Sequence, residues 1–169
     1  VPADVRIETY VRAKTMEAIE ATHKKVDTAL KAGGDAVGAQ TVIATMPGQL
    51  PLACNNRLNE LFVTNAKIAE PNVAVKDAGH FSASTDMGDV SHLLPVIHPF
   101  IGGVDGFLHT ADFHVVDFKH AVLLPAKAFA MMIIDLLADD AELARQIKAE
   151  HHPLLTKEEY IAKLDKYFQ

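Results

Sequence analysis

The residues best suited to chemistry in this chain are its nine histidines. Neutral imidazole is a common ligand for zinc and related metals, so this abundance makes a metal centre the first hypothesis. The spacing does not complete such a centre, because His109 and His114 stand five residues apart in "HTADFH", no HExxH motif is present, and Cys54 is the single cysteine. The sequence by itself therefore does not display a three-ligand or four-ligand metal site.

A polar segment at residues 84–100 is the second candidate. Its sequence, "STDMGDVSHLLPVIHPF", places aspartates, histidines and prolines between apolar runs. A metal site, a substrate loop and a polar bend between buried elements are the three interpretations, and we expect His92 and His98 to be structural. No GxSxG elbow, phosphate-binding loop or GxGxxG fingerprint occurs elsewhere.

Composition limits the class of protein. The chain has 169 residues, is 49% hydrophobic and carries a formal net charge of -6, which suits one ordinary core or two small lobes. The acidic balance argues against nucleic acid as a partner, and no apolar run reaches the roughly 18 residues of a membrane span. Because Cys54 cannot form an internal disulfide, we expect a cytoplasmic protein. The opening residues have no signal-peptide pattern and read like the middle of a longer polypeptide.

The first seventy residues predict an α+β lobe. Side chains alternate over residues 5–12, which favours a strand, and "AQTVIATM" at residues 39–46 favours another. Between them, apolar residues from Met16 to Leu30 recur at helical spacing until "AGGD", with His23 expected to be a packed histidine on that stripe. A second amphipathic helix is predicted over residues 58–66. Strand, helix, strand and helix in this order predict helices on one sheet face.

The rest of the chain predicts a buried strand followed by helices. Residues 93–102, "LLPVIHPFIG", are expected to include a core strand. The helix predicted over residues 120–138 is apolar around nearly its whole circumference and should lie between other elements, with Pro125 either inside it or in its first turn. The tail predicts two surface helices separated by Pro153, the second with Thr156 as its N-cap. The predicted fold class is α/β.

The order of these motifs resembles a known family. "STDMGDVS", "LLPVIHPFIG", "LHTADF" and "PAKAFAMMIIDLL" are similar to the C-terminal part of the catalytic domain of the dinuclear-metal amidohydrolases and peptidases. That family includes aminoacylases, glutamate-releasing carboxypeptidases and aminobenzoyl-glutamate hydrolases, and the likeness is closest to the last. The run from "VRIETYVRA" to "LPLACNNRL" resembles its lid, or dimerisation, domain. The resemblance implies that residues 1–70 form the later half of that lid and residues 71–169 the C-terminal part of an α/β zinc-peptidase-like catalytic domain.

The resemblance also assigns a metal ligand and a substrate turn. His109 in "LHTADF" looks like the family's last metal ligand, with a polar loop histidine as the plainer alternative. Ser84, Thr85 and Asp86 hold the place of the family's turn that faces the carboxylate end of the substrate. A turn rich in N–H groups is a reasonable anion cradle, although "SAS" replaces the family's glycines here. Asp89 is expected either to belong to this turn or to cap a helix.

One residue of the lid is implied to act on the scissile bond. Asn55 in "CNNRL" resembles a family asparagine that reaches toward the scissile carbonyl, and Asn56 is the alternative if the register is shifted by one residue. A fixed amide donor near a carbonyl oxygen can stabilise the charge that develops there.

The implied activity is hydrolysis of the amide bond of N-acyl or N-aroyl amino acids or small peptides. The family uses two divalent ions, for which zinc is expected here and manganese is the alternative. Its other ligands and its glutamate base come from the N-terminal half of the catalytic domain, whose motifs this sequence lacks. We therefore expect an incomplete chain that is inactive alone and forms a homodimer or higher oligomer. The alternatives are a non-catalytic dimerising or binding module with the same fold, and an unrelated α+β protein.

Overall fold

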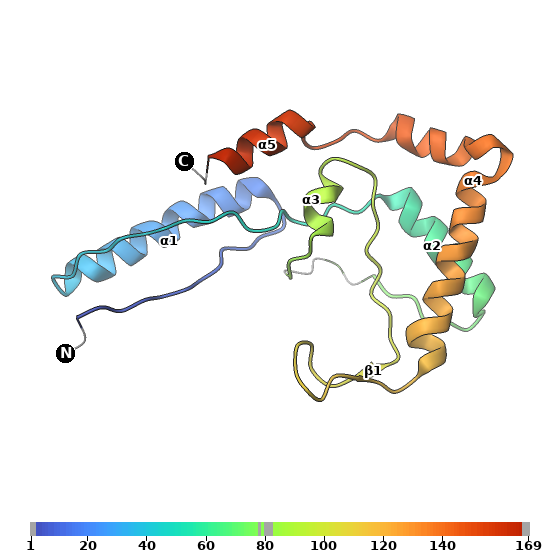
Figure 1. Cartoon of the computed structure of the whole chain (residues 1–169), viewed down its shortest axis with the longest axis horizontal. Helices are drawn as coiled ribbons and strands as arrows, with labels where there is room; N and C mark the ends of the chain where they lie inside the picture. The colour runs from blue at the N-terminus through green and yellow to red at the C-terminus, as the bar shows by residue number, and fades with distance from the viewer. Residues whose placement is uncertain (1–2, 78, 80–82, 167–169) are drawn as a thin grey trace. The chain divides into compact units, whose positions relative to one another are not determined.

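The computed structural model of this chain describes residues 3–77, 79 and 83–166. The elements fall in two compact units, one formed by residues 3–52, 79, 83–89 and 157–166 and the other by residues 53–77 and 90–156 (Figure 1). In chain order they are α1 (Met16–Ala36), α2 (Asn56–Ala69), α3 (Met87–Ser91), β1 (Val104–Asp105), β2 (His114–Val115), the π-helical turn η1 (Lys119–Leu123), α4 (Leu124–Glu150) and α5 (Lys157–Asp165).

The fold is mostly helical with one small sheet, which is compatible with the predicted α/β or α+β class. The division at residue 70 into lid and catalytic parts stays a prediction, because the two compact units describe how this chain packs and not the domains of a parent enzyme.

Helix α1 confirms the first predicted helix. Thr15 caps it, since its hydroxyl accepts a hydrogen bond from the Ala18 N–H at 3.3 Å. The helix continues through "AGGD" and ends at Ala36, two residues before Gly38, whose φ of 71° suits glycine. The predicted end was therefore slightly early: Gly33 and Gly34 lower helix propensity by about 1 kcal/mol each but do not forbid helical backbone.

His23 was predicted to be packed in a core, and this prediction is wrong. Helix α1 contains no buried residue, and the His23 side chain is 35% exposed. Its Nε2 lies 3.5 Å from an Asp27 carboxylate oxygen one turn later. The apolar stripe on α1 is real, but too little chain packs on it to bury an imidazole.

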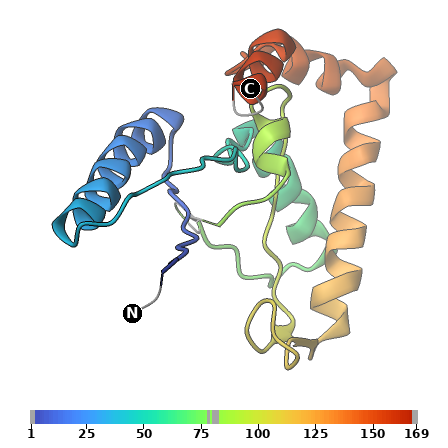
Figure 2. The same cartoon turned by 60° about the vertical axis from the view of Figure 1, so that its left-hand side comes forward.

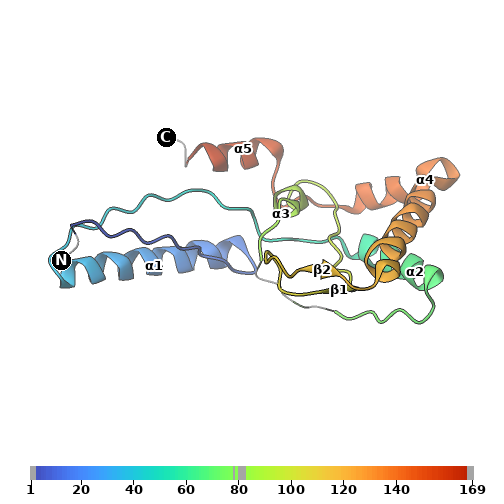
Figure 3. The ribbon, with the colours of Figure 1, turned by 60° about the horizontal axis from the view of Figure 1, so that its bottom comes forward.

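The predicted strands over residues 5–12, 39–46 and 93–102 are not formed in the described part of the chain. The first two are extended backbone before and after α1 in the chain (Figure 2), with Val5, Ile7 and Val42 at 71%, 70% and 83% exposure. A strand needs a neighbour that pairs its N–H and C=O groups, and alternation in one segment cannot supply that neighbour. The sheet that forms is β1 with β2, antiparallel, with Val104 opposite Val115 (Figure 3).

The core of the second unit lies between α2 and α4, which run side by side in Figures 1 and 2. The predicted helix over residues 58–66 is confirmed by α2, and its buried residues follow helical spacing. The buried cluster takes three residues from each helix: Leu58, Phe62, Ala66, Ala128, Met132 and Ile147.

One polar side chain enters this core. Asn65 is only 1% exposed, and its side-chain NH₂ donates to the Leu61 carbonyl at 3.1 Å and to an Asp135 carboxylate oxygen at 2.7 Å. Both amide hydrogens therefore have acceptors, one of them charged. The Asn65 to Asp135 hydrogen bond therefore sets the position of α2 along the axis of α4.

Helix α4 begins at Leu124, one residue before Pro125. The π-helical turn η1 precedes it, and Pro125 lies in the first turn of the α-helical part, which confirms the interpretation that the helix begins near this proline. Proline has no N–H to donate to the preceding turn, so the regular hydrogen-bond pattern starts after it.

A sharp bend divides α4 into a long and a short arm (Figure 1). Ala138 leaves the helical region with a ψ of 160°, and Asp139, Asp140 and Ala141 are left-handed with φ of 49°, 59° and 59°. The bend confirms that the first surface helix of the tail is distinct from the apolar helix. The second surface helix is α5, which begins directly after Thr156 and has Glu158 and Glu159 in its first turn.

The bend predicts an unusual effect of glycine. Left-handed backbone costs an L-residue about 1–2 kcal/mol, so Ala141→Gly is expected to stabilise the chain by about 1 kcal/mol in urea unfolding. The control is Ala144→Gly in the regular short arm, where glycine should destabilise by about 1 kcal/mol. If both variants lose stability equally, α4 is continuous through residue 141.

The ion pair between Glu70 and Lys119 ties the end of α2 to η1. The Lys119 ammonium lowers the pKa of Glu70 from its ordinary 4.5, and Glu70 in turn raises the pKa of Lys119 from 10.5. The Glu70 contribution to stability is thus present above about pH 4.5 and lost as the pH falls through its lowered pKa.

Glu70→Gln should therefore reduce stability slightly at pH 7 and not at pH 2.5, because Lys119 is 65% exposed and surface ion pairs contribute little. Urea midpoints at the two pH values measure this. Glu60→Gln, at an exposed position of α2, is the matched control and should leave the pH dependence of the urea midpoint unchanged. Equal changes in both variants would mean that the pair has no specific effect.

Candidate functional site

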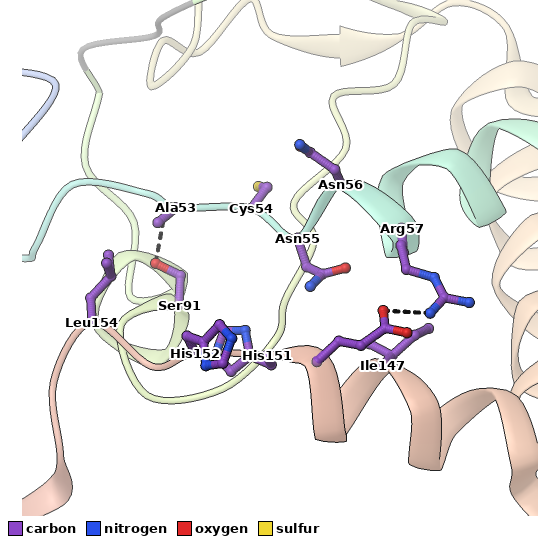
Figure 4. A pocket seen from close by; sticks show the side chains of 11 residues that line it. Ala53, Cys54, Asn55, Asn56, Arg57, Ser91, Ile147, His151, His152 and Leu154 are labelled. Atoms are coloured by element: carbon purple, nitrogen blue, oxygen red, sulfur yellow. Dashed lines mark hydrogen bonds and ion pairs between the residues drawn. The ribbon is translucent and has the colours of Figure 1, made fainter.

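A cavity of 360 Å³ opens in the second unit where α2 begins and α4 ends (Figure 4). Asn55, singled out from the sequence for catalysis, lines it, and so does Asn56, the alternative for that role. The wall is made by the start of α2, one residue of α3, and the end of α4 with the residues after it: Ala53, Cys54, Asn55, Asn56, Arg57, Ser91, Ile147, Glu150, His151, His152 and Leu154.

Asn55 is held in place from two sides. It is the N-cap of α2, because its side-chain oxygen accepts from the Leu58 N–H at 3.1 Å, and its own backbone N–H donates to the Val96 carbonyl at 2.8 Å. The capping oxygen is occupied, which leaves the side-chain NH₂ as the donor for a ligand. A fixed amide donor at a cavity wall has the chemistry expected of a group that polarises a carbonyl.

The structure gives the two neighbouring asparagines different positions. Asn55 is half-buried and caps α2, whereas Asn56 is the first helical residue and is exposed. Both line the cavity, so the family register remains a prediction for either residue.

The cavity also carries charge. Arg57 Nη1 donates to the Glu150 carboxylate at 2.6 Å, with the two side chains 40% and 59% exposed (Figure 4). Next to this pair, the buried Nε2 of His151 has no hydrogen-bond partner among the described residues. Ser91 is 1% exposed and its hydroxyl accepts from the Ala53 N–H at 3.0 Å, which fixes the chain entering α2. Such a wall can hydrogen-bond a small polar molecule.

The residues of this wall were not predicted from the sequence. Arg57 and Glu150 are 93 residues apart, and His151 precedes a second histidine and Pro153 at the end of a helix. The adjacent histidines His151 and His152 are the one sequence feature that points to this wall. Their spacing to the other possible ligands does not match a metal-binding motif.

The predicted substrate turn lies in the first unit. Thr85 closes it, because its carbonyl accepts from the Gly88 N–H at 2.8 Å and its hydroxyl accepts from the Met87 N–H at 3.4 Å. The Asp86 carboxylate accepts from the Gln49 side chain at 2.8 Å, and Ser84 precedes the turn in irregular backbone. Two N–H groups of the turn are thus engaged internally. Gly88 is tightly placed, since a Cβ on it would lie 1.9 Å from the Leu50 carbonyl oxygen.

Asp89 lies in the first turn of α3, and its carboxylate accepts from the Tyr160 hydroxyl at 3.3 Å. Burial and the nearby Asp89 raise the pKa of Tyr160 above 10.0, so the phenol stays protonated and can donate. This contact gives Asp89 a structural role in the first unit.

His109 lies in the loop between β1 and β2. It is exposed and left-handed, with a φ of 66°, a region where histidine is found more often than most residues. The loop is closed by Thr110, whose hydroxyl donates to the Phe107 carbonyl at 2.6 Å and also contacts Asp112. The turn therefore presents the imidazole of His109 outward on a defined backbone.

The described residues do not form a complete metal site. Within residues 3–77, 79 and 83–166, no group of three or more histidine, cysteine, aspartate or glutamate side chains is arranged to hold a metal ion. One imidazole is too small a donor set for zinc, which takes three or four protein ligands.

The predicted site residues are divided between the two units. Asn55 and His109 belong to the second unit, but His109 is not among the residues lining the cavity, and Ser84, Thr85 and Asp86 belong to the first unit. His92 is buried and its carbonyl accepts from the Leu155 N–H at 3.0 Å, while His98 contacts the Phe100 ring edge-on at 5.5 Å. Both observations agree with structural roles for these two histidines.

Comparison with known proteins gives one distant relation to a peptidase. The chain is 28% identical over 151 residues to a mouse protein named Xaa-Arg dipeptidase, a match that covers 85% of this chain and 35% of the relative. The chain therefore spans about a third of the length of the curated relative that it matches. No protein-family model and no solved structure matches the chain.

Proposed function

We propose that this chain is the C-terminal portion of a metal-dependent amidohydrolase that cleaves the amide bond of N-acyl or N-aroyl amino acids or small peptides. The observation that carries the proposal is the 28% identity to a dipeptidase along most of the chain. The order of the motifs from "STDMGDVS" to "PAKAFAMMIIDLL" is in keeping with it.

In this proposal each predicted residue has one task. His109 is a ligand of one of two divalent ions, zinc or manganese, and the remaining ligands and the glutamate base belong to a part of the enzyme outside this sequence. Asn55 donates its side-chain N–H to the carbonyl under attack, and its capping bond to Leu58 supports this role by fixing the amide. Ser84, Thr85 and Asp86 face the carboxylate end of the substrate.

The substrate class is a small molecule with an amide bond and a free carboxylate. The resemblance favours aminobenzoyl-glutamate, whereas the name of the mouse relative indicates dipeptides that end in arginine. A panel of p-aminobenzoyl-glutamate, N-acetyl amino acids and Xaa-Arg dipeptides separates these possibilities. The proposal includes a cytoplasmic location and a homodimer or higher oligomer.

The alternative is a non-catalytic dimerising or binding module derived from the same fold. It needs no metal ligands from outside this sequence. The polar cavity beside Asn55 would then be its ligand site.

The test compares this chain with the longer product of its own reading frame. Bound zinc and manganese are measured by elemental analysis, and hydrolysis of the substrate panel by chromatography. Stoichiometric metal and turnover only in the longer protein are the expected result. Tight metal binding or hydrolysis by the 169 residues alone would show that the site is misplaced, and a longer protein without either would favour the module.

A further inference from the structure

The substrate turn is short and lies at the surface of the first unit. We use this name for residues 84–89, which contain the predicted substrate-facing residues Ser84, Thr85 and Asp86. Ser84 and Asp86 are exposed, and Thr85 is half-buried. Two backbone N–H groups of the turn donate to Thr85 and so close one bend of the chain. These internal bonds do not set where the bend points, so its direction depends on contacts with other segments.

An anion site made of backbone N–H groups depends on the direction of those groups. Each N–H must point to the place where the carboxylate binds, and the chain loses conformational entropy when it is held in that arrangement. When the arrangement exists before the ligand arrives, this loss is not subtracted from the binding free energy. Contacts that hold the substrate turn therefore increase the affinity for a carboxylate without touching it.

One segment before α2 holds the middle of the turn. The Gln49 side-chain NH₂ donates to the Asp86 carboxylate at 2.8 Å, from a position 37 residues earlier in the chain. The Asp86 carboxylate is thereby held, whereas a carboxylate that turned toward a bound anion would repel it. The buried Leu50 lies against the same turn, because its carbonyl oxygen would be 1.9 Å from a Cβ on Gly88. Glycine at this position therefore allows the two backbones to approach.

Helix α5 holds the end of the turn. The Tyr160 hydroxyl donates to Asp89 Oδ1 at 3.3 Å, from a position 71 residues later in the chain, and both side chains are half-buried. One helical turn further along α5, Lys163 Nζ lies 3.6 Å from a Glu20 carboxylate oxygen on α1. Residues three positions apart share one side of a helix, so α5 is held through this side at two points. The Tyr160 hydroxyl thus connects a docked helix to the substrate turn.

We propose that Tyr160 and Gln49 are positioning residues for the substrate turn, which hold its backbone in the arrangement that binds the carboxylate of the substrate. Both act through the turn, at Asp89 and Asp86, and neither touches the substrate. This inference rests on the proposed function, since it takes the turn to face the carboxylate end of the substrate. It adds that a residue of α5 contributes to substrate affinity.

Tyr160→Phe tests the proposal in the longer protein, because it removes the hydroxyl and keeps the ring. For the substrate of the panel that is hydrolysed fastest, KM should rise about 10-fold and kcat should stay within about twofold, since the turn contributes to binding. Gln49→Leu should have the same effect and is the second variant in case Tyr160→Phe does not fold. Tyr10→Phe is the matched control, because Tyr10 is 77% exposed and lies before α1, and its KM should stay within about twofold of the parent.

Two further measurements separate positioning from a general loss of structure. The first uses the analogue of the same substrate in which the free carboxylate is a carboxamide, as a competitive inhibitor. Its inhibition constant should change less than about twofold in Tyr160→Phe, because a neutral amide gains little from an anion cradle. The second is amide hydrogen exchange in the chain of 169 residues, which needs no activity. The N–H groups of Met87 and Gly88 should exchange about fivefold faster in Tyr160→Phe, while those of α2 keep their rates.

The outcomes distinguish this inference from the proposed function. A longer protein that hydrolyses no member of the panel would contradict the proposed function, and the substrate role of the turn with it. If the longer protein is active but KM stays within about twofold in both Tyr160→Phe and Gln49→Leu, the proposed function stands and this inference alone is wrong. Equal weakening of the carboxylate substrate and the carboxamide analogue, or unchanged exchange at Met87 and Gly88, would also overturn it.

Discussion

His109→Ala is expected to reduce amide hydrolysis by the longer protein more than about 100-fold and to remove at least one bound metal ion. Loss of groups that merely orient a metal ligand costs about 10–100-fold, so loss of a ligand should cost more. Elemental analysis and initial rates on the substrate panel measure the two effects. They should appear together if His109 binds metal.

Two further variants separate this role from a structural one. His109→Gly also removes the imidazole and should therefore be as inactive as His109→Ala. Because glycine suits the backbone φ of 66°, this variant should be at least as stable in urea as His109→Ala. His114→Ala, in the same hairpin, removes a side chain whose Nδ1 lies 2.6 Å from the Asp112 carbonyl and should keep activity within about twofold. Full activity and metal content in His109→Gly would make His109 a loop histidine.

Phe62→Ala is expected to destabilise the second unit by about 3–5 kcal/mol. Phe62 is 7% exposed, packs its ring 4.9 Å from that of Phe129, and belongs to the one hydrophobic cluster described between α2 and α4. Domains are stable by only about 5–15 kcal/mol, so this loss is a large fraction of the total. Thermal unfolding followed by circular dichroism should show a Tm lower by roughly 10 °C.

The control for this prediction is Phe107→Ala in the β1 to β2 loop. Phe107 is 80% exposed, and its truncation should change stability by no more than about 0.5 kcal/mol. If the two phenylalanine variants unfold alike, α2 and α4 are not packed as described. The same experiment also tests the cavity, because Leu58 and Ile147 in this cluster hold the two helix ends that form its walls.

The helices were predictable because their signals are local. Apolar spacing located α1 and α2, proline fixed the start of α4, and Pro153 separated the tail helices. Each of these depends on residues within one or two turns, so no distant partner is needed. The left-handed residues at the bend of α4 were not predictable, since none of Asp139, Asp140 or Ala141 requires that conformation.

The strand predictions were wrong because strand formation depends on distant residues. Alternation over residues 5–12 and 39–46 is compatible with a strand, but pairing depends on a second segment at the right distance and register. The same dependence on distant segments governs the candidate site. Asn55 was singled out by resemblance, and its cap on α2 is a local contact three residues along the chain. The Arg57 to Glu150 pair beside it, in contrast, follows from how α2 meets α4.

By itself, the sequence determined the helices and the amphipathic stripe that packs α2 on α4, because helical periodicity is written in neighbouring residues. It also indicated the relation to a peptidase through the order of its motifs. Only the tertiary structure decided that Asn65 is buried against Asp135, that a polar cavity forms beside Asn55, and that one side of α4 stays exposed. These features depend on which surfaces meet, and contact between residues seventy or more positions apart is set by packing and not by local sequence.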